Sequence, residues 1–231
     1  MQAKVNTWVW ALGVAMQSTL LMALIVRRLP RRIPVFTLLI AFYLVRSAVL
    51  FGSSGHVSRA ALAAIYNGLS LADLMLQIAV AAEIAVLAMR QRGGLTLGRS
   101  GALLGLLAVA ASIGWAAGLR WQTRGRVSLD RGQIALAVLF VLLFVWGSAV
   151  GASGLVRRQM EGFALYSGIS LASQVERYQA AVHRDAGMYI GWSYTVAAVY
   201  LVVLGYWLLT LRDPEAAKGN SATRPGAIAR A

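Results

Sequence analysis

The sequence predicts an all-α fold, a polytopic transmembrane bundle of seven helices with its N-terminus outside and its C-terminus inside. Of its 231 residues, 59% are hydrophobic and only 13% are charged, whereas soluble domains are about 45–50% apolar and about 25% charged. The apolar residues also fall into runs long enough to cross a bilayer, whose hydrocarbon core is about 30 Å thick. Composition and run length together therefore favour an integral membrane protein.

The first two spans are expected at residues 7–26 and 33–51. The first run is too long for the core of a typical signal peptide and no small-x-small cleavage site follows it, so we expect it to be retained. Trp8 near its start suits the membrane interface. A basic loop, Arg27–Arg32, separates the two spans, and Pro34 falls in the first helical turn of the second, where proline is tolerated.

The remaining spans are expected at residues 61–89, 101–119, 133–155, 162–175 and 188–211. The third is the most polar, and the fourth contains glycines four residues apart, which allow close helix packing. The fifth is the most hydrophobic, and the sixth is short, contains serines and can extend beyond the membrane into residues 176–181. The seventh is rich in tyrosine and tryptophan, which either line a substrate path or, as is more common, form interface belts and packing contacts. Connecting segments are expected at residues 52–60, 90–100, 120–132 and 156–161.

Lysine and arginine are more numerous on one side of these spans than on the other. The richer set of segments comprises residues 27–32, 90–99, 157–158 and 212–231. Because cytoplasmic loops carry an excess of basic residues, this side is expected to face the cytoplasm. We therefore expect a multi-pass protein of a bacterial-type inner membrane, with one transmembrane domain at residues 1–211 and a disordered polar cytoplasmic tail at residues 212–231.

The net charge of +14 does not predict nucleic-acid binding. The arginines cluster between apolar runs, where they act as topology signals and contact the headgroups of anionic lipids. A nucleic-acid-binding domain would instead show a continuous basic face on a soluble fold. The expected partners are therefore the bilayer with its anionic headgroups and, in one hypothesis below, another membrane protein.

Polar side chains interrupt the third span at helical spacing. Asn67, Ser70, Asp73 and Gln77 fall on one side of that helix, with Asp73 near its middle. A carboxyl group at that depth normally faces other helices or water, and it is often functional. Arg46 in the second span either extends to the outer surface or pairs with a group on the third helix. This polar track predicts the handling of a small solute or an ion.

Two other interpretations of these acidic residues remain open. Asp73 is equally consistent with a structural carboxylate that is hydrogen-bonded between helices. In that case the chain acts as a membrane scaffold or sensor subunit, through helix contacts with a partner protein. Glu83 lies near the inner surface, where we expect it to be solvated or to meet Arg90 and Arg92.

A third hypothesis comes from two short motifs on the expected outer side. The sequence Ser-Gly-His ending at His56, and Arg177 followed six residues later by His183, resemble two of the three motifs of the type-2 phosphatidic acid phosphatases. That resemblance implies a lipid-phosphate hydrolase in which a histidine attacks phosphorus, as a neutral imidazole can near pH 7. The family's Lys-x6-Arg-Pro motif is missing here.

No cofactor or metal is expected. The chain has no cysteine, which excludes disulfides and thiolate ligands. Its two lysines, Lys4 and Lys218, lie outside the spans, so it lacks the Schiff-base lysine that a retinal protein needs. Haem is not expected either, because neither histidine lies in a span.

A broader pattern extends over several segments of the chain. It consists of Trp10, Gln17, the Arg27–Pro34 loop, Glu83 and the Gly162-Phe163 pair. This pattern resembles a group of uncharacterised bacterial seven-helix integral membrane proteins. The resemblance implies the fold and carries no activity with it.

Overall fold

The computed structural model describes residues 2–53, 57–91, 105 and 131–211, and these residues confirm the all-α class. They form six α-helices and one short 3₁₀ helix, and the described ranges contain no strand. The elements are α1 (Gln2–Val26), η1 (Leu29–Arg31), α2 (Pro34–Ser53), α3 (Arg59–Arg90), α5 (Arg131–Ala149), α6 (Gly154–His183) and α7 (Ala186–Thr210).

Five of these helices, all except α6, are long and apolar enough to cross a membrane. α3 has 32 residues, which at about 1.5 Å per residue exceeds the hydrocarbon thickness of a bilayer. The fold is thus that of a multi-pass membrane protein. The expected fourth span at residues 101–119 and the tail at residues 212–231 lie outside the described residues. The number of seven spans and the orientation of the termini therefore remain predictions.

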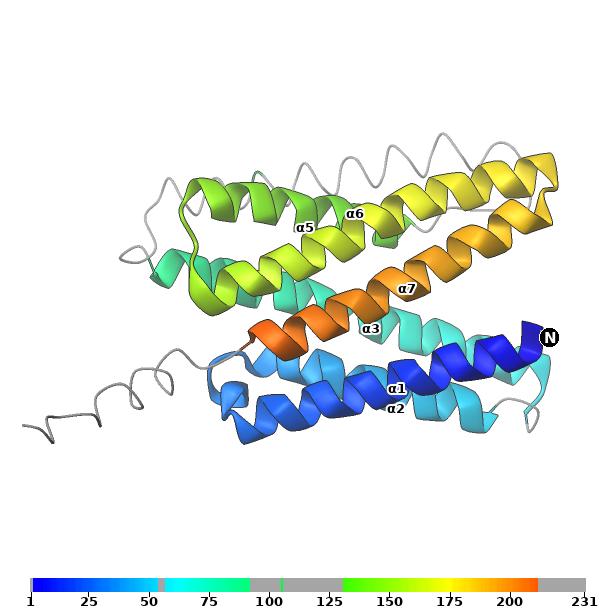
Figure 1. Cartoon of the computed structure of the whole chain (residues 1–231), viewed down its shortest axis with the longest axis horizontal. Coiled ribbons are helices and arrows are strands. Elements are labelled where there is room, and N and C mark those ends of the chain that lie inside the picture. The colour runs from blue at the N-terminus through cyan, green and yellow to red at the C-terminus, as the bar shows by residue number, and fades with distance from the viewer. Residues whose placement is uncertain (1, 54–56, 92–104, 106–130, 212–231) are drawn as a thin grey trace, which may run out of the picture.

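The six helices close into a ring. Each contacts the next in the order α1, α2, α3, α5, α6 and α7, and α7 contacts α1 again; α3 also touches α6. The helices run side by side along the long axis of the molecule (Figure 1). A ring of this kind has an interior to which every helix can contribute a side chain.

The helix ends have specific local causes. Ser58 caps α3 by accepting a hydrogen bond from the backbone N–H of Ala61 at 3.2 Å, and Asp185 caps α7 in the same way. α5 ends at Ala149, before a turn in which Gly151 has φ 68°. Only glycine adopts that left-handed conformation without a steric cost.

α6 differs from the sequence prediction. It is continuous through residues 156–161, for which a connecting segment is expected, whereas its continuation beyond residue 175 agrees with the extension into residues 176–181. The charged residues that lower its hydropathy also stabilise the helix, because Arg157 and Glu161 form an i,i+4 ion pair at 2.8 Å. α6 stops at Arg184, which has φ 58°.

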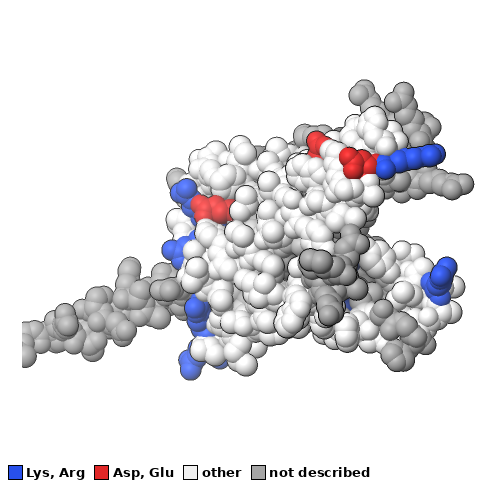
Figure 2. Space-filling model, turned by 45° about the vertical axis from the view of Figure 1, so that its right-hand side comes forward, with Lys and Arg blue, Asp and Glu red and all other residues white. Residues whose placement is uncertain are grey.

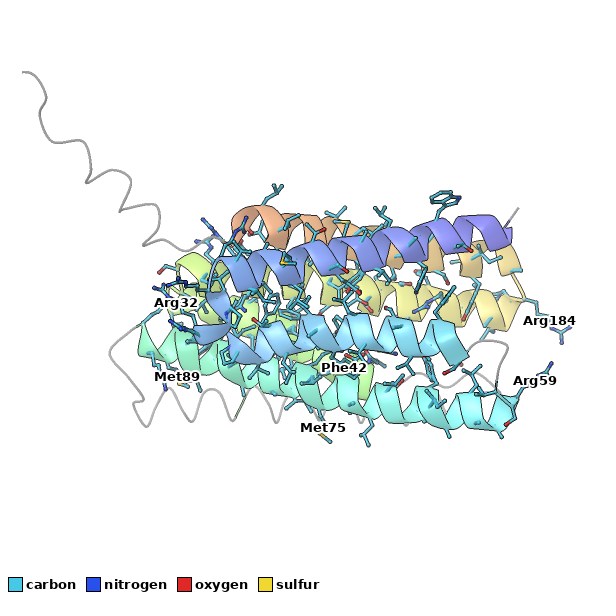
Figure 3. All side chains as sticks on the ribbon, turned by 90° about the horizontal axis from the view of Figure 1, so that it is seen from below. Arg32, Phe42, Arg59, Met75, Met89 and Arg184 are labelled. Carbon is cyan, nitrogen blue, oxygen red and sulfur yellow. The ribbon has the colours of Figure 1, made fainter. Side chains whose placement is uncertain are left out.

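One end of the bundle, called the basic end below, gathers arginines. They are Arg27, Arg28, Arg31, Arg32, Arg90, Arg157 and Arg158. On the face shown in Figure 2, charged side chains lie at the two ends of the bundle, with an almost uncharged belt between them. Figure 3 places Arg32 and Met89 at the basic end and Arg59 and Arg184 at the opposite end.

The outer surface between the two ends carries large apolar side chains. Met75 is 57% exposed, Val145 58% and Val202 62%, and Figure 3 shows Met75 pointing away from the bundle. Large apolar side chains exposed in this number are unfavourable in water and favourable in contact with lipid. The pattern supports a bundle with its apolar side chains directed outward into a bilayer.

The apolar core lies next to the basic end and contains an aromatic cluster, defined as Phe36, Phe140, Phe163 and Trp207. Phe140 stacks on Phe163 with ring centroids 4.4 Å apart, and Trp207 lies 5.0 Å from Phe36 and 4.9 Å from Phe163. Gly162 makes room for this cluster, because a Cβ at that position would lie 2.3 Å from the indole nitrogen of Trp207.

Candidate functional site

The interior of the helix ring contains a polar cavity of about 330 Å³. Every one of the six described α-helices contributes at least one polar side chain to its wall. The lining residues are Gln17 from α1, Tyr43, Arg46 and Ser47 from α2, Asp73 and Gln77 from α3, Gln133 from α5, Tyr166 from α6 and Tyr200 from α7. Most of these positions lie near the middle of their helices, so the cavity sits deep within the bundle.

An ion pair between α2 and α3 forms one wall of the cavity. Nη1 of Arg46 lies 2.5 Å from Oδ2 of Asp73, and these side chains are only 21% and 8% exposed. Gln77 donates from Nε2 to the other carboxylate oxygen of Asp73 at 2.8 Å. The guanidinium carbon of Arg46 also lies over the ring of Tyr66, 5.8 Å from its centroid. Both oxygens of the buried carboxylate are therefore satisfied, as a charge in a low-dielectric interior requires.

Tyrosines and an amide form the facing wall. Nε2 of Gln17 donates to the hydroxyl of Tyr200 at 2.7 Å. The Tyr200 ring lies 6.3 Å from that of Tyr43 and 5.6 Å from that of Tyr166, and Tyr43 interacts with Asp73. A series of hydrogen-bonding and aromatic contacts thus links α1 through α7 and α2 to the ion pair.

The predicted polar track is only partly brought together. Asp73 and Gln77 line the cavity with Arg46, which pairs with the third helix instead of extending to the surface. Ser70 is half-buried and does not line the cavity, and Asn67 is exposed and lines a separate hollow between α2 and α3. The helical spacing groups these residues broadly, but the cavity takes only the part of that face nearest the ring interior.

Glu83 has a different role from the one expected. Its two carboxylate oxygens accept hydrogen bonds from the backbone N–H groups of Val35 at 2.9 Å and Phe36 at 3.0 Å. These N–H groups belong to the first turn of α2, which has no partner for them within its own helix. Glu83 therefore caps α2 from a neighbouring helix, where a negative charge is also favoured by the helix dipole.

The phosphatase-like residues do not form a site in the described part of the chain. Arg177 and His183 both lie on α6, where a separation of six residues turns their side chains to different sides of the helix. Nε of Arg177 donates to the backbone oxygen of Ser173 at 3.3 Å, and His183 is exposed. His56 lies outside the described residues. Across the described ranges, no group of three His, Asp or Glu side chains is placed to hold a metal ion.

Sequence reasoning missed most of the facing wall. Gln17 was available as an amide in the middle of an apolar run, and that position was a signal for an interior polar site. Tyr200 belongs to the tyrosine-rich seventh span, for which the sequence favours an interface belt over the lining of a substrate path. Tyr43 and Tyr166 carry no distinguishing local pattern. Their role depends on how far each helix is rotated toward the ring interior, which a single sequence does not show.

Comparison of the chain with protein-family models, with curated proteins and with solved structures found no match.

Proposed function

We propose that this chain is a multi-pass protein of a bacterial-type inner membrane that binds and handles a small polar solute in the cavity of its helix ring. One observation carries the proposal: all six described α-helices direct polar side chains into one interior cavity, while each of them also exposes large apolar side chains on its outer surface. Burying so many polar groups is costly, and a packed apolar interior would hold the helices together without them. A binding role explains their concentration at one place.

The size and wall of the cavity support this proposal. Its volume of about 330 Å³ is at the lower end of the range of about 300–1,000 Å³ for ligand sites. An aqueous cavity between helices near the middle of a membrane is also where transport proteins bind their solutes. The small volume favours a solute of few atoms over a peptide or a lipid.

A scaffold or sensor subunit is the second candidate, and the aromatic cluster favours it. In each helix, apolar core residues lie between the cavity and the basic end, so the bundle is closed on that side. A protein that binds a solute and signals through helix contacts needs no opening there. A hydrolase has no comparable support from the described residues.

The expected orientation places the basic end in the cytoplasm, with the N-terminus outside and the C-terminus inside. α3 offers a direct test because Arg59 and Arg90 lie at its opposite ends and are both exposed. The chain contains no cysteine, so the single variants Arg59→Cys and Arg90→Cys each carry one thiol. An impermeant maleimide applied to intact cells should label Arg59→Cys only, and Arg90→Cys only after lysis. The reverse pattern would overturn the orientation, and labelling of both in intact cells would overturn the span.

Solute binding is tested by filling the cavity. Ser47 lines it, so Ser47→Leu inserts an apolar side chain into the site, whereas Ser18 is exposed on the outer face of α1 and makes Ser18→Leu the matched control. Purified protein in lipid nanodiscs is titrated with small amino acids, amines, carboxylates and polyols, and its melting temperature is followed. We expect stabilisation by at least one class, lost in Ser47→Leu and kept in Ser18→Leu. No stabilisation by any class, or equal stabilisation of both variants, would contradict the proposal.

A further inference from the structure

The guanidinium group of Arg46 has unused hydrogen-bonding capacity beside the cavity. Only its Nη1 has a hydrogen-bonding partner among the described residues, which is Oδ2 of Asp73. A guanidinium carries five N–H groups in a planar fork that suits a carboxylate. Asp73, by contrast, has both oxygens occupied, by Arg46 and by Gln77. The hydrogen-bonding groups that remain available on this wall are therefore the N–H donors of Arg46.

The facing wall has unused capacity of the opposite kind. Gln17 is 6% exposed and lines the cavity, and its Oε1 is buried with no partner in the described part of the chain. Its Nε2 donates to the hydroxyl of Tyr200, which leaves Oε1 as the atom of the amide without a partner. A buried acceptor without a donor is unfavourable. A ligand that brings an N–H group to this oxygen removes that penalty.

Tyrosine rings stand next to this acceptor. The Tyr200 ring is inclined by 84° to that of Tyr43 and by 60° to that of Tyr166, so the three rings form walls at an angle to one another. The faces of aromatic rings attract cations, most strongly where water is excluded. The Gln17 side of the cavity therefore suits an ammonium group.

The fixed charges of the cavity cancel, since Arg46 and Asp73 are the charged residues that line it and they form a pair. A ligand with net negative charge meets the carboxylate of Asp73, and one with net positive charge meets the guanidinium of Arg46. In a low-dielectric site either repulsion is strong. A ligand that is neutral overall but carries two separated charges avoids both.

We propose that the cavity binds a small zwitterion of the amino-acid type, with its carboxylate on the guanidinium of Arg46 and its N–H-bearing ammonium on Oε1 of Gln17, between the tyrosine rings. This inference rests on the proposed function and specifies its solute. The volume of about 330 Å³ is sufficient for a single amino acid. No covalent step is involved.

Four probes of similar size separate the contributions of charge. β-Alanine carries both charges, ethanolamine the ammonium alone, propionate the carboxylate alone and glycerol neither. Each is titrated by isothermal calorimetry into the full-length protein in nanodiscs of uncharged lipid. We expect β-alanine to bind at least about tenfold more tightly than the other three, since each of them loses a charge-assisted hydrogen bond.

Variants then test the two ends of the ligand separately. Gln17→Leu removes the acceptor and should weaken β-alanine binding by about tenfold or more, while betaine, which has no N–H group, should be much less affected. Gln159→Leu is the matched control, because Gln159 is a fully buried glutamine that does not line the cavity. Arg46→Gln should weaken β-alanine and betaine alike, since both carry the carboxylate. An equal loss of the two ligands in Gln17→Leu would refute the assigned ammonium position.

The outcomes distinguish this inference from the function on which it rests. If glycerol, ethanolamine or propionate binds as well as β-alanine and Ser47→Leu abolishes that binding, the cavity is a solute site but not for a zwitterion. If none of the four probes binds to the wild-type protein, the zwitterion is refuted. Failure of the wider solute titration with Ser47→Leu and Ser18→Leu then overturns the proposed function itself.

Discussion

Breaking the Arg46–Asp73 pair should destabilise the bundle more when the arginine is removed than when the carboxylate is removed. Arg46→Gln leaves the charge of Asp73, whose side chain is 8% exposed, with the neutral groups of Gln77 and Tyr43 beside it but without its cation. Uncompensated buried charges of this kind cost about 3–5 kcal/mol. Asp73→Asn leaves the charge on Arg46, which is 21% exposed and keeps some access to water, so we expect a loss of about 1–3 kcal/mol.

The double variant Arg46→Gln/Asp73→Asn leaves no charge in the cavity and should be more stable than Arg46→Gln alone. Equilibrium unfolding in mixed micelles, followed by tryptophan fluorescence, gives the four free energies of this mutant cycle. Arg157→Gln is the control, because it removes an arginine whose side chain is 60% exposed in its ion pair with Glu161, and it should cost less than about 1 kcal/mol. If the losses of the two single variants add up to the loss of the double variant within about 0.5 kcal/mol, the contact does not couple the residues energetically and the reasoning fails.

Three further predictions concern packing, capping and pH. Gly162→Ala should cost about 1–3 kcal/mol in unfolding free energy, because the added methyl group displaces Trp207, whereas Gly168→Ala on the same helix has no neighbour within 4 Å and should be neutral or slightly stabilising. Glu83→Gln should cost roughly 1–3 kcal/mol in the same assay, since an amide offers one acceptor to the two backbone donors of α2; a neutral result would refute the capping role. Glu161 lies at the basic end, just outside the expected sixth span. Burial alone would raise its pKa, but hydrogen bonds from the neighbouring hydroxyl and guanidinium groups outweigh burial, so the net effect is a lowered pKa. Its folded pKa is below its unfolded one, so its contribution is present above about pH 4.3 and lost as the pH falls through the folded pKa. The melting temperatures of wild type and Glu161→Gln should therefore converge in acid, and a constant difference would contradict this.

The all-α class and the apolar spans could be predicted from the sequence because they depend on composition and run length, which are local properties. Helical periodicity also put Asp73 and Gln77 on one face. The partner of Arg46 stayed open, since both alternatives fit one sequence and the choice depends on which face of α2 meets α3. Because the sequence does not show how each helix is rotated, it also did not predict that Tyr43 and Tyr166 line the cavity.

The structure differs from the sequence prediction at two other places, the extent of α6 and the role of Glu83. The first difference arises because hydropathy and helix formation are separate properties. The apolar signal of α6 is interrupted by Arg157 and Glu161, yet these residues are good helix formers and pair across one turn, so the helix continues. Glu83 looks like a solvated residue near a helix end when α3 is considered alone. Its function as a cap becomes evident only with the unsatisfied N–H groups of a second helix beside it.

The contacts that close the basic end of the bundle have different consequences for a transporter and for a sensor. Transport to the basic end requires Phe36, Phe163 and Trp207 to separate, and Trp207 is also held by a hydrogen bond from its indole nitrogen to the backbone oxygen of Arg158 at 3.2 Å. α7 is fixed at the same end, where Nη1 of Arg27 donates to the backbone oxygen of Leu211 at 2.6 Å. A sensor can keep all of these contacts and transmit only a small shift of α7. Flux of a bound solute through proteoliposomes therefore demands that this end opens, and binding without flux identifies the aromatic cluster as a permanent closure.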